Sequence, residues 1–119
     1  MHINFPPETE VKFTIEAVQD DIPIRGNAIA SGDDEEDARI ENEIIDRLND
    51  GDVWAWAQVD VYASWNGFEG RDSLGGCSYA DEAEFCQPGG YFDDMKERAY
   101  EELCAAIGKA AKAIEPLLA

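Results

Sequence analysis

The sequence has few basic residues and almost no histidine. Nine Lys and Arg stand against 27 Asp and Glu, which gives a formal net charge of −18, and His2 is the single histidine. Nucleic-acid binding depends on cationic side chains that neutralise phosphates, and a field this negative also repels anionic lipid head groups. The composition therefore argues against direct binding of nucleic acid or of a membrane surface.

Long apolar runs are also missing, since no stretch reaches the ~20 residues that a membrane-spanning helix needs. The beginning, MHINFPPETE, has no basic region followed by an apolar stretch, so we expect no secretory signal. Three cysteines, Cys77, Cys86 and Cys104, are an odd number without paired spacing, which favours free thiols in a reducing cytosol. These absences predict a cytoplasmic protein.

No motif of a cofactor, metal or catalytic site is present. The glycines of ASWNGFEGRDSLGGCSY (63–79) follow neither phosphate-loop spacing, and we assign them to a hairpin and its exit turn. A Cys–His pair would need His2, a zinc site lacks C-x₂₋₄-C spacing, and DDEED lacks the spacing of a calcium loop. We therefore expect no cofactor, no metal and no enzymatic activity.

At 119 residues the chain is expected to form a single domain, 1–119. Residues 10–18 and 52–65 alternate apolar and polar side chains, as half-buried strands do. Asn66-Gly67 is the preferred dipeptide of a two-residue hairpin, which pairs Trp65 with Phe68. Pro23 demotes any strand after the first to an edge strand or a loop.

Three segments have helical patterns. Residues 33–49 form an acidic amphipathic helix capped by Ser31 or Asp33, with an apolar stripe of Ile40, Ile44, Ile45 and Leu48. Ser78 and Asp81 resemble a capping box ahead of a short helix at 80–86. Residues 91–114 form a long helix whose inward positions run from Phe92 to Ile114. The predicted class is α+β: an antiparallel sheet of three to four strands with a central hairpin, and the acidic and C-terminal helices packed on one face.

Both long helices are expected to expose carboxylates on the side away from their apolar stripes. These outward positions are Glu35, Glu43, Asp46 and Asp50 on the first helix, and Asp94, Glu97 and Glu101 on the second. Acids at i, i+3, i+4 and i+7 lie roughly 5–6 Å apart, which is comparable with phosphate spacing along a strand. Glu41 falls near the apolar stripe, and we expect it to bend outward. The alternative is that the acidity serves only solubility or tolerance of high salt.

A second candidate surface is aromatic. If the helices cover the Val/Ala face of the sheet, Trp54, Trp56 and Tyr62 lie on the opposite face, and aromatic residues of this kind are typical of protein interfaces. The other interpretation is that Trp54 and Trp56 belong to the core, covered by residues 20–32.

Two segments, SWNGFEGRDSLGGCSYADEAEF and GGYFDDMKERAYEEL, carry a resemblance. They resemble small, mostly uncharacterised proteins of bacterial phages and plasmids, over roughly the C-terminal half. In size, acidity and α+β make-up the chain is also similar to anti-CRISPR and DNA-mimic inhibitors. That similarity implies a non-enzymatic inhibitor in the host cell cytosol, whose partner is a host protein or ribonucleoprotein with a basic nucleic-acid-binding groove.

Two alternatives stay open at this stage. One is an interaction module that uses the Trp54, Trp56 and Tyr62 face, and the other is a small enzyme with a carboxylate pair or with Cys77 as nucleophile. No feature of the sequence indicates an oligomeric state.

Overall fold

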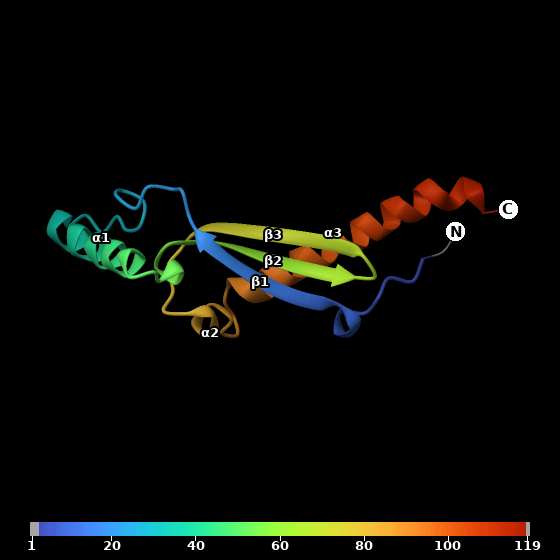
Figure 1. Ribbon diagram of the computed structural model, residues 1–119, viewed down its shortest axis with the longest axis horizontal. Coiled ribbons are helices and arrows are strands. Elements are labelled where there is room, and N and C mark those ends of the chain that lie inside the picture. The colour runs from blue at the N-terminus through green and yellow to red at the C-terminus, as the bar shows by residue number, and fades with distance from the viewer. Residues whose placement is uncertain (1–2, 119) are drawn as a thin grey trace. The chain divides into compact units, whose positions relative to one another are not determined.

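The structure, a computed structural model, describes residues 3–118. Its three strands lie side by side in the order β1–β2–β3 and form an antiparallel sheet (Figure 1). The predicted α+β class is confirmed, with three strands rather than four. Three short 3₁₀ helices (η) accompany the α-helices, and the elements in chain order are η1 Glu8–Glu10, β1 Lys12–Gln19, α1 Asp34–Asn49, η2 Val53–Ala55, β2 Ala57–Trp65, β3 Phe68–Cys77, α2 Glu82–Phe85, α3 Tyr91–Ile114 and η3 Glu115–Leu117.

The chain divides into two compact units whose boundaries fall inside the strands. Unit 1 takes in the described residues of Met1–Ile15, Asp60–Asp72 and Pro88–Ala119, and unit 2 comprises Glu16–Val59 and Ser73–Gln87. The sequence predicted one domain without a linker, and no linker separates the two units, because each of the three strands contributes residues to both.

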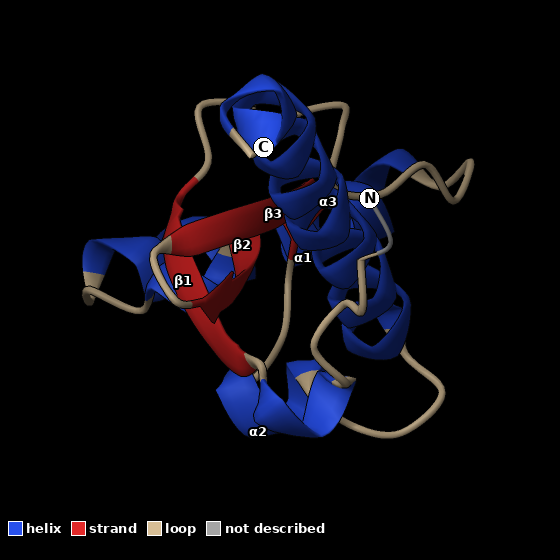
Figure 2. Cartoon of the chain, turned by 90° about the vertical axis from the view of Figure 1, so that its right-hand side faces the viewer, coloured by secondary structure: helices blue, strands red, loops and turns tan. Residues whose placement is uncertain are grey.

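In unit 1 the long helix α3 runs alongside β3 (Figure 2). Its buried residues, Met95, Ala99, Leu103 and Ile107, recur every four positions, so they form one continuous face. Gly70 of β3 lets the helix approach closely: a Cβ there would overlap the carbonyl oxygen of Ala99 and the backbone nitrogen of Leu103. The glycine is therefore required by the distance between strand and helix, not by a turn.

The hairpin between β2 and β3 follows the prediction. β2 ends at Trp65, β3 begins at Phe68, and the two residues between them have positive φ, 49° at Asn66 and 84° at Gly67. Along β2, Val59, Val61 and Ala63 are fully buried. Asp72 lies on the edge strand β3.

Unit 2 has a core of its own, in which α1 packs against η2 and the residue that follows it. Ile44 of α1 lies with Ala55 and Trp56 in a buried cluster, surrounded by the partly buried Ile24, Ala28, Ile40 and Leu48. The predicted helix at 33–49 is thus present, and three of its four stripe residues belong to this cluster. Asp33, one of the two predicted caps, accepts hydrogen bonds from the backbone N–H groups of Glu35 and Glu36.

Four details differ from the sequence-based expectations. The strand expected from residue 52 begins at Ala57, because Asp52 caps the 3₁₀ helix η2 and accepts a hydrogen bond from the backbone of Trp54. Asp81, not Ser78, caps α2. Gly75 and Gly76 lie within β3 instead of a turn after it. Ile114, expected to face inward, is 49% exposed because the buried face of α3 ends at Ile107.

Candidate functional site: the acidic faces of α1 and α3

Some carboxylates at the start of α1 are used by the helix itself. Asp33 caps the helix, and Asp37 accepts hydrogen bonds from the backbone nitrogen of Ser31 at 3.2 Å and from its hydroxyl at 2.5 Å. A negative charge in the first turn also stabilises the positive end of the helix dipole. The DDEED run is therefore partly structural, and only part of it is left to face a partner.

The four residues predicted for the first helix, namely Glu35, Glu43, Asp46 and Asp50, are all exposed, and Asp50 directly follows the last residue of α1. Glu43 differs from the other three because it forms an ion pair: its Oε1 lies 2.6 Å from Nη1 of Arg39. Arg39 also binds Glu36, whose pKa it lowers mainly through this hydrogen bond, while the two carboxylates raise the pKa of Arg39. Within residues 3–118, no ion pair engages Glu35, Asp46 or Asp50, so these three remain available.

Glu41 was expected to bend outward, and this prediction is wrong. Its side chain is buried; Oε1 accepts a hydrogen bond from Arg25 at 3.2 Å and Oε2 accepts one from the backbone nitrogen of Gly26 at 2.8 Å. A buried carboxylate needs such partners, since an unpaired buried charge is strongly destabilising. Glu41 therefore fastens the loop at 25–26 to α1 and is no ligand for a partner.

The three predicted residues of α3, Asp94, Glu97 and Glu101, are exposed as well. They share this part of the helix with Arg98, whose Nε lies 2.9 Å from Oδ2 of Asp72 on β3. That hydrogen bond, more than the nearby Asp94 and Glu101, raises the pKa of Arg98. The acidic face of α3 therefore also contains one arginine, Arg98, whose side chain is bound to Asp72 of the sheet.

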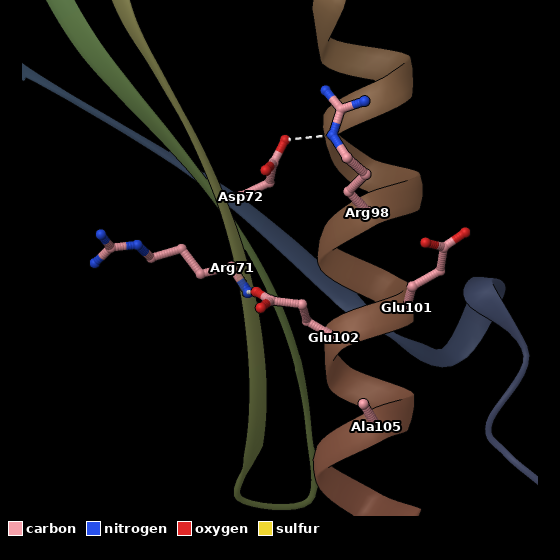
Figure 3. Close-up of a pocket in the computed structure, with 6 residues that line it drawn as sticks. All are labelled: Arg71, Asp72, Arg98, Glu101, Glu102 and Ala105. Carbon is pink, nitrogen blue, oxygen red and sulfur yellow. Dashed lines mark hydrogen bonds and ion pairs between the residues drawn. The ribbon is translucent and has the colours of Figure 1, made fainter.

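Beside this face lies a surface groove of about 380 Å³ (Figure 3). It is lined by Arg71, Asp72, Arg98, Glu101, Glu102 and Ala105. The guanidinium of Arg71 points away from α3, toward Asp60 at 3.8 Å, and its backbone nitrogen donates to Glu102 at 3.2 Å. Since both arginines of the groove already have acidic partners within unit 1, the groove is not arranged as an anion cradle.

The aromatic surface is only partly present. Trp56 is 3% exposed, and its ring nitrogen donates to the carbonyl of Ile22 at 2.7 Å. Trp54 is half-buried and packs with Tyr79 and with Phe85, which is 1% exposed. For Trp56 the core interpretation, in which residues 20–32 help to cover it, describes the surroundings better than an interface does. Trp54 is covered by Tyr79 and Phe85 instead. Tyr62, in unit 1, is half-buried on β2.

The buried carboxylate of Asp20 was not predicted from the sequence. Asp20 is 9% exposed; its carboxylate accepts hydrogen bonds from Ile22 at 3.0 Å and from the backbone nitrogen of Gly76 at 2.6 Å. A Cβ at Gly75 would lie 2.9 Å from Oδ2 of Asp20. The glycine pair therefore allows β3 to approach this carboxylate. No local signal in the sequence pairs residues 20 and 76.

Cys77 is an unsuitable nucleophile in this setting. The side chain is buried, and its Sγ donates a weak hydrogen bond to the carbonyl of Leu74 at 3.5 Å. Burial, assisted by the negative charge of Asp20, raises the pKa of the Cys77 thiol to about 11. The thiolate is the reactive form, so the thiol is held in its inert state at neutral pH.

This state of Cys77 can be tested by alkylation with iodoacetamide. Because its pKa is raised from 9.0 to about 11, we expect Cys77 at pH 8 to react about a hundredfold more slowly in the folded protein than in the unfolded chain. The raised pKa also makes the stability of the folded state depend on pH. The stabilising contribution of the protonated Cys77 thiol is complete below pH 9 and is lost as the pH rises toward 11. Peptide mapping by mass spectrometry measures the rate, and rapid alkylation of folded Cys77 at pH 8 would contradict the assignment.

Among residues 3–118, no group of three His, Cys, Asp or Glu side chains is arranged to hold a metal ion. No helix in this part of the chain combines the length and the apolar character needed to cross a membrane. His2, the base that a Cys–His pair would need, lies outside the described residues.

Comparison of the chain with protein-family models, with curated proteins and with solved structures gives no match.

Proposed function

We propose that this chain is a non-enzymatic inhibitor that binds the basic nucleic-acid-binding groove of a host protein or ribonucleoprotein. The observation that carries the proposal is the exposure of all seven predicted carboxylates on or next to two helices, in a chain whose net charge is −18. Within Glu43, Asp46 and Asp50, and within Asp94, Glu97 and Glu101, neighbours are three or four residues apart, which is roughly 5–6 Å on a helix. A groove lined with Lys and Arg therefore finds negative charges at distances similar to those of phosphates.

The similarity in size, acidity and α+β make-up to anti-CRISPR and DNA-mimic inhibitors fits the same proposal. An inhibitor of a host defence complex, acting in the host cell cytosol as anti-CRISPR proteins do, needs no catalytic residue and no cofactor. It needs a surface that competes with DNA. Unlike a solubilising charge, such a surface has to be recognised at specific positions.

The experiment is a binding assay with the chain immobilised, a bacterial host lysate as the source of partner, and duplex DNA as competitor. We expect the retained protein to bind nucleic acid and to be released by duplex DNA. The logarithm of its affinity for the chain should fall linearly with the logarithm of the salt concentration, because binding exchanges counterions. Retention that persists at high salt and resists DNA would contradict the proposal. It would favour an apolar interaction instead.

A further inference from the structure

The last turns of α3 and the 3₁₀ helix η3 carry large apolar side chains in contact with solvent. Ile114 is 49% exposed, Leu117 79% and Leu118 59%. Counting in steps of three and four from the last buried position, Ile107, leads through Ala110 and Ala111 to Ile114, the last residue of α3. Leu117 ends η3, and Leu118 follows it with extended backbone. The apolar face of α3 thus continues beyond the part that its own unit buries.

The N-terminal segment extends this surface. A Cβ at Gly108 would be 3.9 Å from the ring of Phe5, which is itself 44% exposed. The hydroxyl of Tyr100 donates to the carbonyl of Pro6 at 2.7 Å and so fixes this segment to α3. We call the resulting surface the apolar end, and it comprises Ile3, Phe5, Ala111, Ile114, Leu117 and Leu118, beside a hollow of about 190 Å³ that is lined by Ile3, Gly108, Ala111, Lys112 and Glu115.

Charge suggests what covers the apolar end. Between Leu103 and Leu118 the chain has two lysines, Lys109 and Lys112, and one acid, Glu115, although acids outnumber bases threefold overall. Two chains of net charge −18 repel each other, and this repulsion is weakest at a surface where acids do not outnumber bases. In an antiparallel pair of α3 ends centred between residues 113 and 114, Lys112 of each copy faces Glu115 of the other.

We propose that the apolar end is a homodimer interface that joins the C-terminal ends of two α3 helices around a two-fold axis. A two-fold interface uses the same surface on both copies, and this surface carries both partners of the Lys112–Glu115 pair. The small side chain of Ala111, beside the hollow, allows close approach of the second helix. Leu117 and Leu118 supply the apolar area whose burial drives association.

The salt dependence of this dimer has the opposite sign to that of the proposed inhibitor binding. Apolar association between two negatively charged bodies is opposed by long-range repulsion, which salt screens. Dimerisation therefore strengthens as salt rises, whereas binding to a basic groove weakens. For this reason, failure of one proposal does not imply failure of the other.

Sedimentation velocity on the full chain, over a range of protein concentrations at low and high salt, tests the proposal. We expect a monomer–dimer equilibrium that shifts toward dimer with salt. Leu117→Glu should weaken it by at least about tenfold, the effect of removing one large apolar contact. Tyr91→Glu is the matched control, since it adds the same charge at the opposite end of α3, where Tyr91 is 57% exposed, and it should change dimerisation less than threefold.

Charge exchange tests the geometry. Lys112→Glu and Glu115→Lys should each weaken the dimer, and the double variant should recover most of the loss. A chain that stays monomeric at high salt and high concentration overturns the proposal. A dimer that Leu117→Glu leaves intact, or that Tyr91→Glu weakens equally, also overturns it. A third contrary result is a monomer that binds anionic vesicles in a flotation assay and depends on Leu117 for that binding.

Discussion

Replacing Gly70 by alanine is expected to lower the free energy of unfolding by about 3 kcal/mol. The new Cβ would overlap the carbonyl oxygen of Ala99 and the backbone nitrogen of Leu103, and it would lie 3.0 Å from the carbonyl carbon of Glu102. All three are backbone atoms of one helical turn, so no side chain can rotate to make room. Either α3 moves away from β3, which opens the core at the fully buried Met95 and Leu103, or the strand bends.

Urea denaturation followed by circular dichroism measures this change. Gly108→Ala is the matched control, because it makes the same substitution inside α3 at a position where the Cβ meets only Phe5, at an ordinary 3.9 Å. An alanine there should stabilise the helix by about 0.5–1 kcal/mol. If both variants change stability in the same direction and by similar amounts, the close approach at Gly70 is not what the glycine provides.

Neutralising three carboxylates of one acidic helix should weaken binding to the basic partner about a hundredfold. Three exposed ionic contacts of about 1 kcal/mol each amount to this factor. Because the two helices belong to different units, each is tested by itself. The α1 variant combines Glu35→Gln, Asp46→Asn and Asp50→Asn, and the α3 variant combines Asp94→Asn, Glu97→Gln and Glu101→Gln.

The control keeps the net charge equal and changes only its location. Glu16→Gln, Asp21→Asn and Glu69→Gln remove three exposed charges outside both helices, so a general electrostatic attraction would respond to this variant as much as to the others. We expect less than a threefold loss for the control, and a smaller slope of log affinity against log salt only for the helix variant that contacts the partner. Equal losses in all three variants, in a competition assay with duplex DNA, would show that position does not matter and that the mimicry proposal is wrong.

The residues whose roles could be predicted are those whose roles depend on near neighbours in sequence. Asn66-Gly67 produces the hairpin because its two positive φ angles are a property of that dipeptide. The helix at 91–114 was predicted with its observed bounds because the glycines before it and Pro116 after it are local signals. The exposure of the seven carboxylates followed from helical periodicity in the same way.

The burial of the tryptophans could not be predicted from local spacing. Alternation over 52–65 placed Trp54 and Trp56 on an outward face, but the cap made by Asp52 replaces the first residues of that strand with a 3₁₀ helix. Trp56 then becomes part of a core with Ile44 of α1, a residue twelve positions earlier. A surface prediction for a tryptophan needs to know which distant segment covers it, and periodicity does not contain this information.

By itself the sequence determined the α+β class, the hairpin, both long helices and the acidic character of their outer faces, because these depend on composition and on spacings of two to four residues. Only the tertiary structure decided which polar groups are buried and paired. Glu41 turns inward to Arg25, Asp20 reaches Gly76 across 56 residues, and Arg98 crosses to Asp72. A buried charge is stable only where distant backbone or side-chain partners converge on it, and that convergence is a property of the folded chain.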